Sequence, residues 1–212
     1  MSVVVNGRFL SRRVTGVDRF AGEVQRRLGR RVTVRRSSAS GFAGHLWEQT
    51  ALAASLRPED TLWSPANTGP VLASRQILMI HDLSPLDHAE WFSATFALWY
   101  RVLWSALIPR VQRILVPSKF VKQRVIARFG AVPLTVVPGG VDPKMFHPRA
   151  SARTLKLPDR YVLFVGSIQP RKNLAALLAA WESVRRRYPG TWLLIAGAGG
   201  PNFGSSPRGT EH

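Results

Sequence analysis

The chain has 212 residues, of which 45% are hydrophobic, which is enough for one complete domain with a core and part of a second. Its 30 Lys and Arg residues against 12 Asp and Glu give a formal net charge of +18, so anionic partners are expected: nucleotide or lipid phosphates, nucleic acid, or an acidic membrane face. The absence of cysteine excludes disulfides, thiolate catalysis and cysteine-based zinc sites. The first residues lack the order of a secretory signal, and a cytoplasmic location is therefore expected.

Short apolar strands alternate with amphipathic helical stretches along residues 1–142. Strands are expected at 3–6, 32–34, 61–63, 76–80, 113–116 and 134–137, and helices at 17–28, 45–56, 92–108 and 119–129, with Ser118 as the cap of the last helix. This alternation is typical of a doubly wound α/β architecture with a parallel sheet. Residues 1–142 are therefore predicted to form a Rossmann-like domain.

After residue 142 the pattern changes. Prolines punctuate a polar, basic stretch, and residues 143–158 are interpreted as an interdomain linker. A strand at 161–165, a helix from 174 and a strand at 192–196 then predict the start of a second Rossmann-like domain over 159–200. Residues 201–212 are rich in Gly, Ser and Pro and are expected to be an irregular tail, so the second domain is expected to be truncated.

The loop after the strand at 161–165 carries two adjacent cations, Arg171 and Lys172, directly before a predicted helix. The positive end of a helix dipole repels cations, and a bound anion would resolve that conflict. The segment therefore suits a phosphate. The alternative interpretation is that Arg171 and Lys172 are solvated loop residues.

Three further positions are candidates in the first domain. Gly16 opens a predicted helix, where a glycine permits close approach of a diphosphate or a sugar, or simply allows a turn. His81 and Asp82 follow a strand, at the sheet edge where such folds bind ligands. His81 could bond a ligand hydroxyl, and Asp82 could orient it or cap the next turn. A metal site at Asp87 and His88 is rejected, because no further cluster completes a ligand shell.

The predicted helix at 92–108 is apolar nearly all round and has Arg101 in its middle, which favours a buried or surface-docking helix over a membrane span. A basic flank follows it and could meet the anionic inner face of a membrane; it consists of Arg110, Arg113, Lys119, Lys122, Arg124 and Arg128. The Gly-rich segment 197–200 only partly matches a dinucleotide fingerprint, because Asn202 stands where a third glycine is needed.

Five motifs follow one another along the chain: Asn-Gly-Arg at 6–8 with Thr-Gly-Val-Asp-Arg at 15–19, Ile-His-Asp-Leu-Ser at 80–84, Val-Pro-Ser-Lys-Phe at 116–120, Val-Pro-Gly-Gly-Val-Asp at 137–142, and Val-Gly-Ser-Ile-Gln-Pro-Arg-Lys-Asn-Leu at 165–174. In this order they resemble the retaining glycosyltransferases of family 4, also called glycosyl transferases group 1. Those enzymes have the GT-B fold, two Rossmann-like domains that face each other across a cleft. The nearest resemblance is to bacterial mannosyl- or rhamnosyltransferases of surface polysaccharide biosynthesis.

The resemblance implies transfer of mannose or a similar sugar, with retention, from a nucleotide-diphosphate sugar to a saccharide or lipid-linked acceptor, without a metal or another cofactor. Gly16 would lie near the donor diphosphate and His81 would meet the transferred sugar. Lys172, with Arg171 beside it, would neutralise the diphosphate as it leaves, and a preorganised cation stabilises that developing charge. The resemblance implies nothing about the oligomeric state.

The chain also departs from the family pattern. Ser167 and Gly139 stand where many relatives have Arg and Asn, and nothing after Gly200 matches the Glu-x7-Glu pattern of the donor site. Negligible transfer by this chain alone is therefore expected. The rival interpretation is a non-enzymatic basic module that binds nucleic acid, but the seven tryptophans lie mostly in apolar patterns rather than between cations, and no specific nucleic acid is expected as a partner.

Overall fold

A computed structural model describes the chain except for residues 1, 13, 74, 148–155, 198 and 200–212. The chain divides into two compact units, Met1–Ser84 with Trp99–Gly140, and Pro85–Leu98 with Val141–His212. The limits predicted for the domains at residues 142, 158 and 200 stay a prediction. Half of the predicted linker, 148–155, and the whole predicted tail, 201–212, lie outside the described residues.

The first unit contains a six-stranded parallel sheet with the order β2-β1-β3-β4-β5-β6. Its strands are β1 (Val3–Asn6), β2 (Val32–Arg35), β3 (Thr61–Ser64), β4 (Gln76–Met79), β5 (Arg113–Val116) and β6 (Leu134–Val136). Each begins where the sequence predicts and ends within one residue of the predicted end. The predicted α/β, Rossmann-like class is confirmed.

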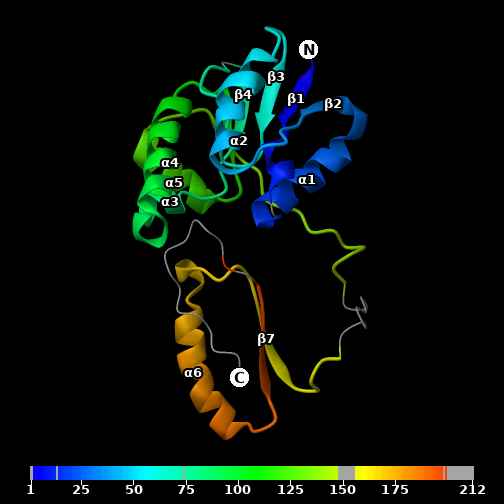
Figure 1. The fold of residues 1–212 in the computed structure, drawn as a ribbon, viewed down its shortest axis with the longest axis vertical. Helices are drawn as coiled ribbons and strands as arrows, with labels where there is room; N and C mark the ends of the chain where they lie inside the picture. Colours follow the sequence, from blue (N-terminus) through cyan, green and yellow to red (C-terminus); the bar gives the residue numbers. More distant parts are fainter. Residues whose placement is uncertain (1, 13, 74, 148–155, 198, 200–212) are drawn as a thin grey trace. The chain divides into compact units, whose positions relative to one another are not determined.

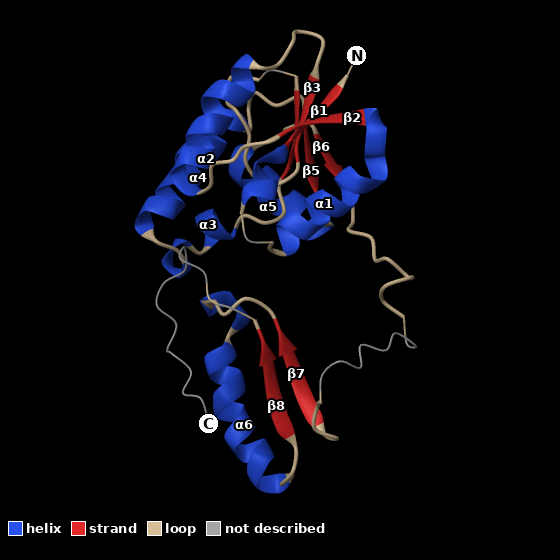
Figure 2. Cartoon of the chain, turned by 45° about the vertical axis from the view of Figure 1, so that its right-hand side comes forward, coloured by secondary structure: helices blue, strands red, loops and turns tan. Residues whose placement is uncertain are grey.

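Helices cover both faces of this sheet, because alternate strand residues point to opposite faces. Val5 and Trp63 pack with Ala21 of α1 (Gly16–Leu28) on one face, whereas Val4 and Leu62 pack with Leu52 on the other. Figures 1 and 2 show α1 on one side of the strands and α2 (Gly41–Trp47) with α4 (Ala94–Leu107) on the opposite side. The residues between β5 and β6 form α5 (Lys119–Phe129), and Ser118 caps it by accepting a hydrogen bond from the backbone N of Val121 at 3.2 Å.

The helix predicted at 45–56 begins earlier, at Gly41, and continues from α2 into a π-helical turn, η3 (Glu48–Leu52). The helix predicted to begin at residue 92 begins at Ala94. Short helical turns also occupy stretches where no helix is predicted: η1 (Gly7–Ser11), η2 (Gly29–Arg31), α3 (Ser84–Asp87) and η4 (Ala89–Trp91). No helix within the described ranges is long and apolar enough to cross a membrane.

In the second unit, the parallel strands β7 (Tyr161–Val165) and β8 (Trp192–Ala196) are joined through the turn η5 (Pro170–Lys172) and the helix α6 (Leu174–Arg187). The strand–helix–strand arrangement predicted here is present (Figure 2). Both strands are exposed along much of their length; Leu163 has 52% of its surface exposed and Trp192 has 58%. A two-stranded sheet with one helix buries little apolar surface, so we expect this unit to contribute less stability than the first.

Candidate functional site

The order of strands in the first sheet changes side between β1 and β3: β2 lies on one side of β1, and β3 to β6 follow on the other. Open α/β sheets bind ligands outside the carboxyl ends of the strands at such a switch point. Three segments reach this edge in the first unit: residues 6–8 after β1, 64–69 after β3, and 81–82 after β4. They are the basis of the candidate site.

A buried ionic cluster lies at the switch point. Arg8 Nε and Glu48 Oε1 are 3.3 Å apart, and their side chains are 7% and 0% exposed. Glu48 Oε1 also accepts hydrogen bonds from Asn6 Nδ2 at 2.5 Å and from Thr68 Oγ1 at 3.0 Å, while Arg8 Nη2 donates to Thr68 Oγ1 at 2.8 Å. The pair therefore ties the segments after β1 and β3 to the helical segment that begins at Gly41.

His45 completes this cluster, and its neighbours fix its protonation. Arg8 Nη1 lies 3.4 Å from His45 Nε2 and can only donate, so Nε2 must carry the lone pair and Nδ1 the proton. Nδ1 lies 3.6 Å from Glu48 Oε2, and neither of these two buried atoms makes a hydrogen bond among the described residues. Burial lowers the pKa of His45, and the Arg8 charge acts in the same direction. The ring is thus neutral at pH 7 and adds no charge to the Arg8–Glu48 pair.

His81 lies in the loop directly after β4, as the sequence predicts. Its backbone N donates to Asn67 Oδ1 at 2.8 Å, and its Nε2 lies 2.9 Å from the carbonyl O of Pro65. Phe20 of α1 packs its ring edge-on against the imidazole at 5.1 Å between centroids. Burial lowers the pKa of His81, so the ring is neutral at pH 7.

Asp82 caps the next turn, one of the two roles considered for it. Its Oδ1 accepts a hydrogen bond from the backbone N of Ser84 at 2.9 Å, where α3 begins. A carboxylate near the first turn of a helix is also stabilised by the positive end of the helix dipole. Binding of substrate by Asp82 stays a prediction.

Gly16 is the first residue of α1, one position before the predicted start of this helix at residue 17, and a Cβ added to it would meet nothing within 4 Å. The same turn contains a buried carboxylate: Asp18 Oδ2 accepts from Thr15 N at 3.0 Å and from Thr15 Oγ1 at 2.6 Å, and Arg12 pairs with Asp18 Oδ1 at 2.6 Å. Part of the positive potential of this helix end is therefore already neutralised within the chain. We expect Gly16 to offer backbone approach more than charge.

Lys172 and Arg171 lie in the second unit, in η5. The aliphatic part of Lys172 lies over Gly166 at the end of β7, since a Cβ placed on Gly166 would be 3.6 Å from Lys172 Cε. Asn173 follows in a left-handed conformation, with φ of 49°, and starts α6. No ion pair joins Lys172 to an acidic residue in the described part of the second unit. Its amine is thus available to an anion.

The structure brings His81, Asp82 and the first turn of α1 to one edge of the first unit, and Lys172 and Arg171 to one turn of the second. Sequence reasoning missed the Arg8–Glu48 cluster. One signal in the sequence was available. Glu48 lies four residues before Leu52, so both residues lie on the same face of the helical segment, and both are 0% exposed. Within the described residues, no three His, Asp or Glu side chains are grouped as metal ligands.

Comparison with known protein families gives a match over most of the first unit. The family model described as Glycosyltransferase Family 4 matches residues 17–145. This range contains β2 to β6 with α2, α4, α5 and all of α1 except Gly16, and it includes His81 and Glu48.

Three similar proteins cover different shares of the chain. A D-inositol 3-phosphate glycosyltransferase of Segniliparus rotundus is 44% identical over 81 residues, which are 36% of this chain and 18% of that protein. A GDP-mannose-dependent alpha-(1-6)-phosphatidylinositol monomannoside mannosyltransferase of Mycobacterium tuberculosis is 36% identical over 90 residues, 39% of this chain and 23% of that protein. A glycogen synthase of Mycobacterium tuberculosis is 28% identical over 122 residues, 57% of this chain and 29% of that protein. The matched segments thus span less than a third of each relative.

Proposed function

This chain belongs to glycosyltransferase family 4, and from that membership we propose that it is part of an enzyme that transfers mannose or a similar sugar from a nucleotide-diphosphate sugar to a saccharide or lipid-linked acceptor, with retention. Surface polysaccharide biosynthesis is the proposed setting. GDP-mannose is the first donor to test, because one of the relatives is named for its dependence on it. The proposal includes negligible transfer by the 212 residues alone, since they contain no Glu-x7-Glu pattern, through which the family's donor site binds sugar and ribose hydroxyls.

The observation that carries the proposal is the position of Lys172. Its side chain lies over the end of β7, where ligands of parallel sheets bind, and it has no acidic partner among the described residues. Cleavage of a glycosyl–phosphate bond adds negative charge to the departing diphosphate. A cation already held beside that oxygen stabilises the transition state more than the ground state. Arg171 is proposed to assist, and no metal is required in this scheme.

Replacement of Lys172 with Ala tests this role. We expect the affinity of the chain for GDP to fall about tenfold or more, because a charge-assisted hydrogen bond contributes roughly 1.5–3 kcal/mol. Titration calorimetry of the wild-type chain and the variant measures the change. Lys122→Ala removes the same charge from an exposed position on α5 and serves as the control.

Equal GDP affinities for Lys172→Ala and Lys122→Ala would refute the role of Lys172. The same titrations with an oligonucleotide at several salt concentrations examine the nucleic-acid alternative, which rests on the net charge of +18. That alternative requires a tight affinity that falls steeply with salt and is indifferent to Lys172.

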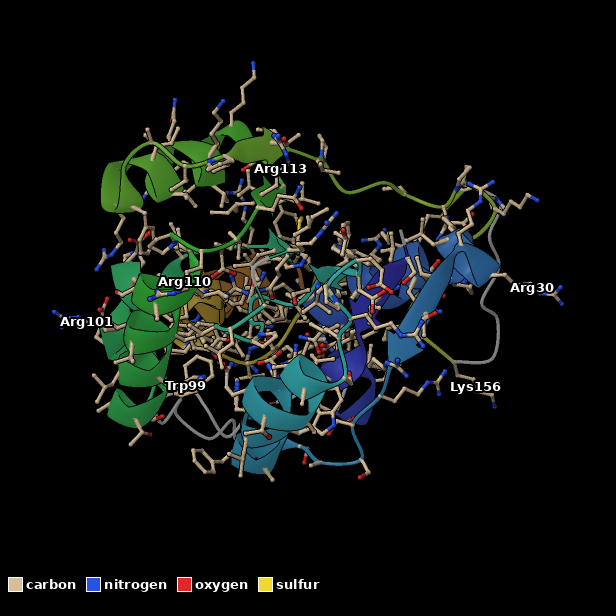
Figure 3. The ribbon with its side chains drawn as sticks, turned by 90° about the horizontal axis from the view of Figure 1, so that it is seen from above. Arg30, Trp99, Arg101, Arg110, Arg113 and Lys156 are labelled. Atoms are coloured by element: carbon tan, nitrogen blue, oxygen red, sulfur yellow. The ribbon has the colours of Figure 1, made fainter. Side chains whose placement is uncertain are left out.

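Peripheral binding to an anionic membrane is the second part of the proposal. On α4, Val102 is 56% exposed and Arg101 points away from the unit, while Trp99 lies on the inner side, where its ring contacts His45 at 5.0 Å (Figure 3). On α5, Phe120 is 70% exposed beside Lys119. Exposed apolar and basic side chains together favour the surface of an anionic bilayer.

Flotation with liposomes measures this binding. We expect recovery of the chain with vesicles that contain phosphatidylglycerol and little recovery with phosphatidylcholine alone, because each basic residue near an anionic surface contributes about 1 kcal/mol. Phe120→Ser should reduce the recovery with anionic vesicles, since it removes the exposed apolar ring and keeps the charge. Identical recovery with both lipids would remove this part of the proposal.

A further inference from the structure

Asn67 connects His81 to the rest of the first unit. Its side-chain Oδ1 accepts the hydrogen bond from the backbone N of His81 at 2.8 Å. Its own backbone N donates to the carbonyl of Met79 at 3.1 Å, and its backbone O accepts from Trp104 Nε1 at 2.8 Å. Trp104 is 0% exposed. Asn67 is therefore held by the end of β4 and by α4, and it transmits that rigidity to His81.

The backbone of Asn67 is in the left-handed region, with φ of 69°. Asparagine tolerates this conformation better than most non-glycine residues, but the conformation still costs free energy and persists only where the surroundings enforce it. Asn173 is the other described non-glycine residue with positive φ, and it lies at the start of α6 in the second unit. Such residues cluster at functional sites.

The same segment fixes the ring of His81. The carbonyl O of Pro65 can only accept a hydrogen bond, so His81 Nε2, 2.9 Å away, must carry the proton. A neutral imidazole then keeps its lone pair on Nδ1. Nδ1 makes no hydrogen bond to any residue that the structure describes, and Phe20 limits rotation of the ring. The lone pair is thus held in one direction and lacks a donor in the part of the chain that the structure describes.

We propose that Asn67 is a positioning residue which, with the carbonyl of Pro65, locks His81 in the Nε2–H tautomer so that Nδ1 accepts a hydrogen bond from a sugar hydroxyl. The identity of the ligand rests on the proposed function, whereas the tautomer lock does not. A diphosphate at neutral pH presents acceptor oxygens and gives Nδ1 nothing to accept. The lone pair of Nδ1 thus suits a sugar hydroxyl rather than a phosphate oxygen.

The electrostatic surroundings keep the ring neutral. Burial lowers the pKa of His81 and Arg12 acts in the same direction, while the hydrogen bond to Pro65 and the charges of Asp82 and Asp18 oppose the change. The balance leaves the pKa below its usual value of 6.5. At neutral pH the ring therefore holds one proton, and Nδ1 remains an acceptor.

Two-bond ¹H–¹⁵N NMR correlations of the full chain, labelled with ¹⁵N-histidine, test the lock, because they distinguish protonated from unprotonated ring nitrogens. His81 is assigned by the signal that His81→Phe removes. In the wild-type chain at pH 7.5 we expect the Nε2–H tautomer alone. Asn67→Gly permits the same backbone conformation but removes the acceptor for the backbone N of His81, so the ring is no longer held at the carbonyl of Pro65 and a mixture of tautomers is expected. Asn67→Asp keeps an acceptor at the same place and should retain the single tautomer.

A mixture of tautomers in the wild-type chain, or an unchanged pattern in Asn67→Gly, would overturn the lock. If Asn67→Gly does not fold, Asn67→Ser replaces it, because its side chain is too short to reach the amide of His81. Addition of GDP-mannose and of GDP separates this inference from the proposed function. A shift of the Nδ1 signal with GDP-mannose alone supports hydroxyl recognition. A locked tautomer that responds to neither compound refutes the sugar contact while the role of Asn67 stands.

Discussion

Glu48→Gln should lower the free energy of unfolding of the first unit by about 3–5 kcal/mol, because it leaves the charge of Arg8 buried without its counter-ion. Glu48 is 0% exposed and its Oε1 accepts three hydrogen bonds, from Asn6, Arg8 and Thr68. The amide of Gln keeps the shape of the carboxylate but not its charge. Urea denaturation followed by tryptophan fluorescence measures the loss.

Two controls isolate the ionic contribution. Glu59→Gln makes the same chemical change at an exposed position and should stay within about 0.5 kcal/mol of the wild-type chain. The double change Arg8→Met with Glu48→Leu removes both charges and should be less destabilised than Glu48→Gln, because no charge is left unpaired. If Glu48→Gln and Glu59→Gln lower the free energy of unfolding equally, the buried Arg8–Glu48 pair does not stabilise the first unit.

The Arg8–Glu48 pair also makes the free energy of unfolding depend on pH. Burial opposes ionisation of Glu48, but His45, the charge of Arg8 and the Asn6 amide outweigh it and hold its pKa below the usual 4.5. A carboxylate with a lowered pKa in the folded state contributes stability that is present above the unfolded pKa and is lost as the pH falls through the folded value. The difference in free energy of unfolding between the wild-type chain and Glu48→Gln should therefore be largest above pH 4.5 and should decrease as the pH falls below that value.

Most of the fold follows from local sequence patterns. Buried strands such as β3 and β4 carry apolar residues between turn residues, and their limits were predicted to within one residue. The position of His81 was also predictable, because a residue after a parallel strand must lie at the carboxyl edge. Family membership, inferred from five motifs, is confirmed by the match over residues 17–145.

The remainder depends on contacts between residues far apart in sequence. Glu48 resembles a solvated helix residue until the fold brings Arg8 and Thr68 to it, 40 and 20 positions away. The hydrogen bond between Asn67 and His81 spans 14 positions and requires a left-handed backbone that the sequence pattern does not reveal. Short helical turns such as η1 lack a full period of apolar residues, so the sequence pattern predicts no helix there.

Gly197 is another residue whose importance appears only in the structure. From the sequence alone, Gly197 is only part of a segment that partly matches a dinucleotide fingerprint. In the second unit it lies against the backbone of Gly166, and a Cβ at this position would overlap the carbonyl group of Gly166. Gly166 in turn donates its N–H to the carbonyl of Ala196 at 2.9 Å and lies beneath the side chain of Lys172. A side chain at Gly197 must therefore displace the strand end that supports the proposed phosphate site.

Gly197→Ala is expected to disrupt this end of the second unit. Overpacking of this kind costs about 1–3 kcal/mol, and a clash with backbone cannot be relieved by rotation of a side chain. We expect protection of the Gly166 amide against hydrogen exchange to fall about tenfold or more, and affinity for GDP to fall with it. Amide exchange followed by NMR and calorimetric titration measure the two effects.

Gly199→Ala is the matched control, since a Cβ at Gly199 meets nothing within 4 Å. It makes the same chemical change two residues away and should leave both measurements unchanged. If the Gly166 amide keeps its wild-type protection against hydrogen exchange in Gly197→Ala, Gly197 does not pack against the backbone of Gly166 as described. Loss of protection without loss of GDP affinity would instead separate the fold of this turn from phosphate binding, because Lys172 would then bind its ligand without the support of Gly166.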